Sequence, residues 1–226
     1  MRGDRDTRFR RISRELATSP RTRRVEFPDT ELDAGDLMRL SYLPRGPQFS
    51  AAADLGYSVD QDLTTPETAV LRDPLGKPVI VHRGSASAKD WLLSDVAIGA
   101  GKAHHDPRQR EARRLTEQVQ RKYGRAADAL GHSLGGRLAE QSGAGGRVIT
   151  FNKAAGPMDL AIAPANGARQ LDMRVPGDVV SALSNRTDRR IERRTVAPVG
   201  RGGIAGAHSL ANLPSRRSKN TRTTRS

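Results

Sequence analysis

Residues 130–136 of this chain read Leu130-Gly131-His132-Ser133-Leu134-Gly135-Gly136. The order Gly, any residue, Ser, any residue, Gly is typical of a nucleophile elbow, a sharp turn between a strand and a helix that exposes a reactive serine. Glycines fit both sides of Ser133 because side chains there would collide with neighbouring backbone. The pattern predicts a strand over 125–130 and a short helix over 134–141.

Strand signals lie on both sides of this elbow. Residues 68–72 and 77–82 predict a hairpin whose turn is Asp73-Pro74-Leu75-Gly76, and Val79–Val81 is short, β-branched and unbroken, as in a central strand. Further strands are predicted over 147–151, 170–175 and 194–198. The alternation of strands with helices predicts an α/β fold with a mostly parallel sheet flanked by helices.

The most distinct helix signal begins at Asp106-Pro107, because aspartate is a favoured N-cap and proline is favoured at the first helical position. Gly124 ends this helix. Its apolar side chains recur at helical spacing at Ala112, Leu115, Val119 and Tyr123. Its polar face is rich in arginine, which we interpret as a solvated surface in preference to a nucleic-acid contact.

A second, weaker helical pattern precedes the hairpin. Four leucines between residues 28 and 67 share one face of a helix, and either Asp29 or Asp36 can cap it. The four are Leu32, Leu37, Leu40 and Leu43. The sequence therefore predicts a helical lead-in over 28–67.

Charge is distributed unevenly along the 226 residues, whose formal net charge is +14. Residues 1–27 carry a net charge of +5 and residues 214–226 another +5, so only +4 remains for the residues between them. We therefore expect flexible basic tails over 1–27 and 214–226, and one core domain over 68–213.

The tails are expected to attract polyanions, either an anionic membrane surface or nucleic acid. The alternative is solvated disorder without a partner. The chain has no cysteine, which excludes disulfides and thiolate metal sites and fits a reducing compartment. We see no apolar run long enough for a signal peptide or a membrane span, and we expect a cytoplasmic protein. The oligomeric state stays open.

The strand predicted over 77–82 runs into His82-Arg83-Gly84-Ser85, and Asp90-Trp91 follows a few residues later. Together with the elbow at 131–136, in this order and spacing, these motifs resemble the class 3 (fungal-type) lipases of the α/β-hydrolase superfamily. The resemblance implies an α/β-hydrolase-like catalytic domain over 68–213. It also implies a serine carboxylic-ester hydrolase: a lipase, esterase, phospholipase or lysophospholipase.

Such an enzyme needs a base to take the proton of Ser133 and a carboxylate to orient that base. In the hydrolase order of nucleophile, acid and histidine, the base follows the serine, and His208 is the only histidine that does. His132, next to Ser133, is expected to point elsewhere. Four aspartates are candidates for the acid: Asp159, Asp172, Asp178 and Asp188. Asp178 is preferred because Pro-Gly-Asp-Val-Val after a predicted strand resembles the acid loop of the family, and Asp188 comes next.

The oxyanion formed by attack on an ester needs preformed hydrogen-bond donors. The backbone N–H of Leu134 is one, and the resemblance implies Ser85 as the second, although an ordinary strand-end turn would also explain Ser85. The segment over 86–89 is too short and too little apolar for a substantial lid, and the chain has few aromatic residues. A smaller ester, a lysolipid or a phospholipid head-group environment therefore fits at least as well as a long triglyceride. No cofactor or metal is expected, and His104-His105 is interpreted as part of a loop.

A second hypothesis belongs to a different class of protein. The chain would then be a non-catalytic protein, associated with a virion or with nucleic acid, that keeps a hydrolase scaffold and binds polyanions through its basic tails. The presence of nucleophile, acid, base and oxyanion serine in order favours the enzyme.

Overall fold

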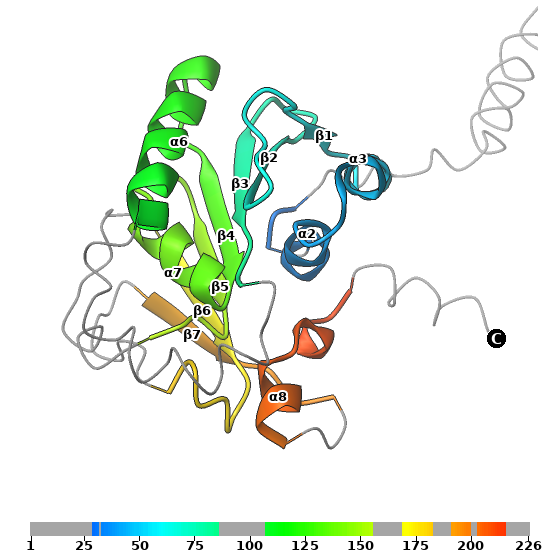
Figure 1. Ribbon diagram of the computed structural model, residues 1–226, viewed down its shortest axis with the longest axis vertical. Coiled ribbons are helices and arrows are strands. Elements are labelled where there is room, and N and C mark those ends of the chain that lie inside the picture. Colours follow the sequence, from blue (N-terminus) through cyan, green and yellow to red (C-terminus); the bar gives the residue numbers. More distant parts are fainter. Residues whose placement is uncertain are drawn as a thin grey trace, which may run out of the picture.

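The computed structural model describes residues 29–31, 33–85, 107–155, 169–182, 191–199 and 203–215. These residues form a seven-stranded sheet with flanking helices (Figure 1). The strands are β1 (Ser58–Val59), β2 (Thr68–Arg72), β3 (Pro78–His82), β4 (Asp128–His132), β5 (Val148–Phe151), β6 (Gln170–Arg174) and β7 (Ile191–Thr195). The helices are α2 (Ala34–Leu40), α3 (Arg45–Asp54), α6 (Pro107–Tyr123), α7 (Leu134–Gln141), α8 (Gly203–His208) and the 3-10 helix η3 (Leu210–Asn212).

The strands lie in the sheet in the order of the chain. β1, β2 and β3 pair antiparallel, and β3 to β7 pair parallel. The predicted hairpin and the mostly parallel α/β sheet are therefore confirmed. Parallel pairing places the carboxyl ends of β3 to β6 along one edge of the sheet, the edge at which α/β folds carry their sites.

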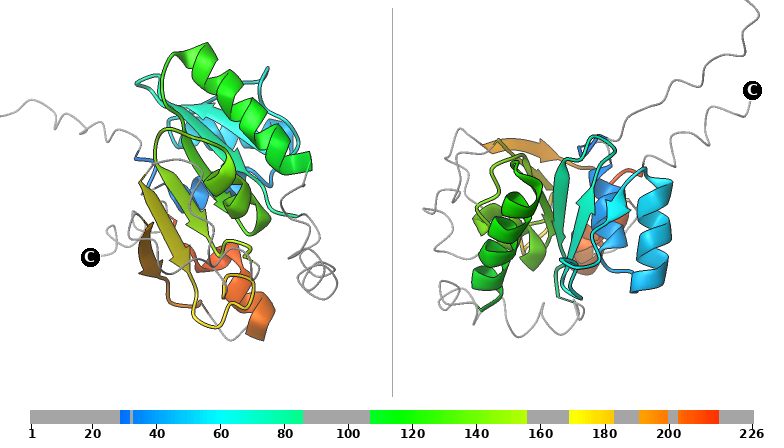
Figure 2. Two further views of the ribbon diagram at one scale, coloured as in Figure 1. Left: turned by 90° about the vertical axis from the view of Figure 1, so that its left-hand side faces the viewer. Right: turned by 90° about the horizontal axis from the view of Figure 1, so that it is seen from above.

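Helices cover both faces of the sheet: α6 and α7 lie on one side, and α2 and α3 on the other (Figure 2). Alternate residues of β3 serve the two faces, as the pleat of a strand requires. Val79 and Val81 belong to one buried cluster with Leu37 of α2, whereas Ile80 belongs to another with Val119 of α6. A strand buried on both faces has to be apolar throughout, which explains the unbroken run at 79–81.

Strand β4 is rich in alanine and glycine because α7 packs unusually close to it. Ala129 lies in a small buried cluster with Ala139 of α7. A methyl group added at Gly131 would collide with the carbonyl of Gly135, and one added at Gly135 would collide with the carbonyl of His82. Small residues are thus required here, and they outweigh the low strand propensity of alanine.

In the N-terminal lead-in, the predicted helix start was wrong. Helix α2 begins after Asp33, rather than after Asp29 or Asp36, and Asp33 makes no side-chain cap. Its carboxylate instead accepts the hydroxyl of Tyr57, 3.3 Å away. Leu37 and Leu40 are buried as expected, but Leu43 is 41% exposed because the helix has ended before it. Leu32 lies outside the described residues.

Two predicted strands are displaced along the chain. β4 spans Asp128–His132 rather than 125–130, because its pairing with β3 and β5 extends to Gly131 and His132. β7 spans Ile191–Thr195 rather than 194–198. Only Ile191 of this edge strand is buried, so the polar sequence 192–195 carried no alternating apolar signal.

Most of the two predicted basic tails lies outside the described residues, so their flexibility and binding stay predictions. The described chain continues past the predicted domain end at 213, since Ser215 Oγ donates to Asp36 Oδ2 of α2 at 3.0 Å. No helix in the described ranges is long and apolar enough to cross a membrane.

The contact between α7 and β4 generates a stability prediction. We expect Gly131→Ala to lower the free energy of unfolding by about 3 kcal/mol or more, because the added methyl group overlaps fixed backbone. The matched control is Gly46→Ala in α3, where a methyl group meets nothing within 4 Å and should stabilise by about 0.5 kcal/mol. Urea denaturation measures both. Equal effects of the two substitutions would contradict the packing described for β4.

Candidate active site

Ser133 lies in a strained turn between β4 and α7. Its backbone has φ 57° and ψ −127°, a region that non-glycine residues rarely occupy and that costs of order 1–3 kcal/mol. Two backbone hydrogen bonds hold this turn in place: the Ser133 N–H donates to Phe151 O at 3.1 Å, and the Ala154 N–H donates to Ser133 O at 3.0 Å. The neighbouring strand β5 and the loop after it therefore support the predicted elbow.

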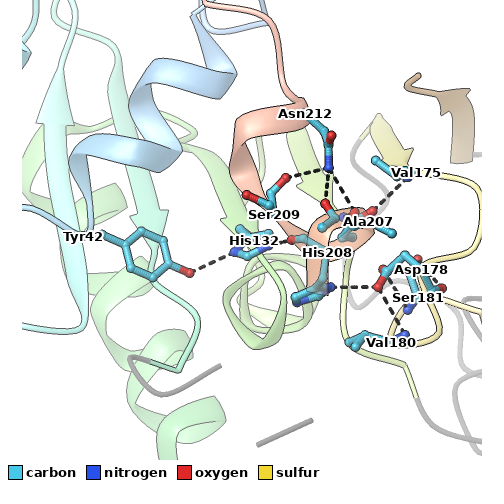
Figure 3. Close-up of polar contacts among 12 residues, drawn as sticks. Tyr42, His132, Val175, Asp178, Val180, Ser181, Ala207, His208, Ser209 and Asn212 are labelled. Atoms are coloured by element: carbon cyan, nitrogen blue, oxygen red, sulfur yellow. Dashed lines mark hydrogen bonds and ion pairs between the residues drawn. The ribbon is translucent and has the colours of Figure 1, made fainter. Parts of the chain in front are cut away.

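Asp178 and His208 form a buried hydrogen-bonded pair, with 2.9 Å between Asp178 Oδ1 and His208 Nδ1 (Figure 3). Asp178 follows β6, in the loop that Gly177 turns with φ 83°. Its carboxylate also accepts the N–H groups of Val180 and Ser181. Burial alone would raise the pKa of Asp178, but the contacts with His208, Ser181 and Val180 outweigh burial and hold the pKa below its ordinary value.

The short helix α8, which carries His208, is held by side chains that bind its last carbonyls. Asn152 Nδ2 donates to Ala207 O at 2.8 Å, and Asn212 Nδ2 donates to Gly206 O at 2.8 Å. His132 Nε2 lies 2.9 Å from His208 O. A helix this short has little stability of its own, so these contacts fix the position of His208.

Asn152 joins three elements at the carboxyl edge of the sheet. It follows β5 with φ 43°, a left-handed conformation that asparagine tolerates better than most residues. Its amide nitrogen binds Ala207 O and its Oδ1 accepts the Val175 N–H at 2.9 Å. Sequence reasoning missed Asn152 and Asn212. An asparagine directly after a predicted strand is a signal for Asn152, but the carbonyl of Ala207 that it binds lies 55 residues away and is brought to it only by the tertiary fold. Asn212 binds carbonyls three to six residues before it, a local contact for which the sequence has no motif.

His132 contacts Tyr42, Phe151 and His208, a structural role that the sequence did not indicate. Its ring stacks on Phe151 with 5.8 Å between centroids, and lies 4.8 Å from the ring of His208. Its Nδ1 is 3.0 Å from Tyr42 Oη. Burial and the nearby His208 lower the pKa of His132 to about 4, so the ring is neutral near pH 7.

His132 links the two segments: a peptide bond joins it to Ser133, and its Nε2 lies 2.9 Å from His208 O. In the described part of the chain, Ser133 Oγ and the His208 ring do not make a direct hydrogen bond. Such bonds are often long or poorly aligned until substrate is bound. The described geometry thus contains the Asp178–His208 hydrogen bond and the elbow at Ser133.

The loop predicted to supply the second oxyanion donor lies against Ser133. A methyl group at Gly84 would lie 3.1 Å from Ser133 Cβ and 2.9 Å from His132 O, and Ser85 is the next residue. Leu134 opens α7, so its N–H has no acceptor within the helix. The Gly136 N–H by contrast donates to Ser133 O at 3.0 Å. Leu134 and Gly84, the residue before Ser85, therefore both adjoin Ser133.

Of the other three candidates for the acid, the structure describes only Asp172. Asp172 lies in a buried charged cluster, where Lys153 Nζ is 3.0 Å from Asp172 Oδ2 and 2.6 Å from Glu140 Oε1. Thr150 also donates to Asp172, at 2.7 Å. Asp172 is thus paired with Lys153 rather than with His208. Asp159 and Asp188 lie outside the described residues.

Several other predicted features also lie outside the described residues, namely the segment over 86–89, Asp90-Trp91 and His104-His105. Within the described ranges there is no group of three His, Cys, Asp or Glu side chains arranged to hold a metal ion. A cavity beside His82 and Arg108 has a volume of about 10 Å³, which is room for about one water molecule.

Comparison with known proteins identifies no family for this chain. No protein-family model matches this chain, and no curated protein matches it. The chemistry of the site therefore rests on its own geometry: a serine in a strained turn, a buried aspartate–histidine pair, and helix and loop N–H groups around them.

Two buried histidines generate a pH prediction. The pKa of His82 is lowered to about 3 by burial and by Arg108, and that of His132 to about 4. In the unfolded chain these histidines bind protons near pH 6.5, whereas in the folded protein they stay neutral to a much lower pH. Their contribution to the free energy of unfolding is therefore complete above pH 6.5 and is lost as the pH falls toward 4. The lowered pKa of Asp178 adds a further loss below about pH 4.

We therefore expect the free energy of unfolding to fall by about 1.4 kcal/mol per pH unit for each of the two histidines below about pH 6.5. Urea denaturation at pH 7.5, 6, 5 and 4 measures the slope. His82→Gln should make it shallower by the share of one histidine. A profile that is flat between pH 7 and 4.5 would show that these rings are not buried as neutral groups.

Proposed function

We propose that this protein is a serine carboxylic-ester hydrolase that works through an acyl-enzyme, on a fold of the α/β-hydrolase type related to the class 3 lipases. The observation that carries the proposal is the buried 2.9 Å hydrogen bond between Asp178 and His208, in a chain whose Ser133 is held at φ 57° in an elbow. A strained serine and a histidine oriented by a carboxylate are the parts that activate a hydroxyl nucleophile.

The mechanism follows from the roles of these groups. Because His208 Nδ1–H donates to Asp178, His208 Nε2 carries the lone pair that accepts the proton of Ser133 Oγ. The Oγ attacks the ester carbonyl carbon, and the Leu134 N–H with Ser85 stabilises the resulting oxyanion. The protonated His208 then gives its proton to the leaving alcohol. Water, activated by the same histidine, hydrolyses the acyl-enzyme.

The substrate class is proposed from the sequence. The segment over 86–89 that follows Ser85 is short, and the chain has only 4% aromatic residues, which favours small esters or lysolipids over long triglycerides. Basic tails at both ends of the chain would hold such an enzyme near an anionic membrane surface. The mechanism uses the chain's own side chains for nucleophile, acid and base.

The first test is covalent labelling of the serine. We expect the wild-type protein to react with a fluorophosphonate probe and to hydrolyse short p-nitrophenyl esters, and Ser133→Ala to lose both. Mass spectrometry of the labelled peptide locates the probe. Ser58→Ala, an exposed serine of β1, is the matched control and should retain both. A wild-type protein that neither labels nor turns over ester would refute the proposed function.

The second test separates the acid candidates. We expect Asp178→Asn to lower kcat by about 10⁴-fold, because the amide no longer holds His208 in the required tautomer. Asp172→Asn and Asp188→Asn should retain most of the activity per folded molecule, with folding followed by circular dichroism. If Asp188→Asn were the variant that lost activity and Asp178→Asn were active, the acid would be wrongly assigned.

A further inference from the structure

A continuous chain of hydrogen bonds connects the loop at Gly84 with the residue proposed as base. The Gly84 N–H donates to Tyr42 Oη at 2.9 Å, and Tyr42 Oη lies 3.0 Å from His132 Nδ1. His132 Nε2 lies 2.9 Å from His208 O. Figure 3 shows Tyr42 reaching His132 from the end of α2, with His208 on the other side of the ring.

The direction of each bond follows from its partners. The His208 carbonyl only accepts, so His132 Nε2 carries the hydrogen. A neutral ring protonated at Nε2 has a bare Nδ1, which accepts the hydroxyl hydrogen of Tyr42. The oxygen of Tyr42 in turn accepts the Gly84 N–H. Every donor in the chain thus has one acceptor, and the chain selects one tautomer of His132.

Tyr42 is well placed to act on two parts of the site at once. Gly84 packs against Ser133 and precedes Ser85, so the bond to Tyr42 fixes the loop on the oxyanion side. The bond to His132 fixes the ring whose Nε2 is hydrogen-bonded to the carbonyl of His208. The guanidinium of Arg83 also lies over the ring of Tyr42, 5.8 Å from its centroid.

The helix before Tyr42 is itself attached to the segment after His208. Arg39 of α2 donates to Leu210 O at 2.9 Å and also to Leu213 O. Asp36 accepts from Ser215 Oγ at 3.0 Å. Tyr42 therefore follows a helix that is hydrogen-bonded to the segment directly after His208.

We propose that Tyr42 is a positioning residue, whose hydroxyl sets the Gly84–Ser85 loop and, through the tautomer of His132, the place of His208. The catalytic consequence rests on the proposed hydrolase function, whereas the hydrogen-bond chain does not. Tyr42 does not touch the reacting atoms. It aligns the oxyanion side of the site with the acid–base side, and losing it should affect the transition state more than substrate binding.

The test is Tyr42→Phe, which removes one hydroxyl group and keeps the ring. We expect kcat on p-nitrophenyl acetate to fall about 10- to 100-fold with KM changed less than about twofold, because two orienting bonds are lost. The control is Tyr57→Phe, another tyrosine from the lead-in whose hydroxyl donates to Asp33. It should lose stability but keep kcat. Equal loss of kcat in both variants, or full kcat in Tyr42→Phe, would overturn the proposal.

A second readout is independent of catalysis. In ¹⁵N NMR of the histidine side chains, wild-type His132 should be the Nε2–H tautomer with a hydrogen-bonded Nδ1, and Tyr42→Phe should shift the Nδ1 resonance. Removal of a donor to the bare nitrogen should also raise the pKa of His132, because that donor favours the neutral ring. An unchanged His132 spectrum in Tyr42→Phe would refute the chain.

The two readouts also keep the proposals apart. If the wild-type protein neither labels with fluorophosphonate nor hydrolyses esters, while the His132 resonance still responds to Tyr42→Phe, the proposed function fails and the hydrogen-bond chain stands. If the enzyme is active but neither kcat nor the resonance responds, the function stands and the role of Tyr42 is refuted.

Discussion

The close approach of α7 to strands β3 and β4 is the constraint on which the site depends. No side-chain carbon fits between the backbones at Gly131, Gly135 and the carbonyl of His82, so the chain must turn within one residue. That residue is Ser133, and its positive φ results from the packing on both sides of it. The strain is offset by hydrogen bonds to Phe151 and Ala154 and by the burial of the alanine cluster around β4.

The Asp178–His208 pair is held in place by side chains that bind the helix α8. α8 is six residues long, too short to hold a side chain rigidly by its own hydrogen bonds. Its terminal carbonyls are bound by Asn152, Asn212 and His132, which come from separate parts of the chain. Asn152 also binds the start of the loop that carries Asp178. The same side chain therefore sets the spacing between the two loops that meet in the Asp178–His208 bond.

Local patterns predicted the parts of the fold that local chemistry controls. The hairpin at β2 and β3, the helix from Pro107 to Tyr123 and the helix from Leu134 to Gln141 follow from turn residues, caps and apolar spacing. Ser133, Asp178 and His208 could be selected from motif and order, and the structure places the last two in contact. Tyr42 and Asn152 could not, because each binds a backbone group more than 20 residues away in the chain, and the local contacts of Asn212 with the carbonyls of Gly206 and Ala207 have no sequence motif. The strand β4 was predicted with the wrong bounds, since its alanines are required by the close packing of α7, a tertiary contact that strand propensity does not report.

The two neighbouring histidines have to differ in protonation for the proposed mechanism to work. Their rings lie 4.8 Å apart, so a charge on one disfavours a charge on the other. Asp178 faces His208 and favours the positive charge that forms there when Ser133 loses its proton. Among the described residues, the hydrogen-bond partners of His132 are the hydroxyl of Tyr42 and a backbone carbonyl, and its pKa is lowered to about 4 by burial and by His208. In the proposed mechanism the proton of Ser133 therefore goes to His208, while His132, whose pKa is lowered to about 4, remains the neutral ring that contacts the His208 carbonyl.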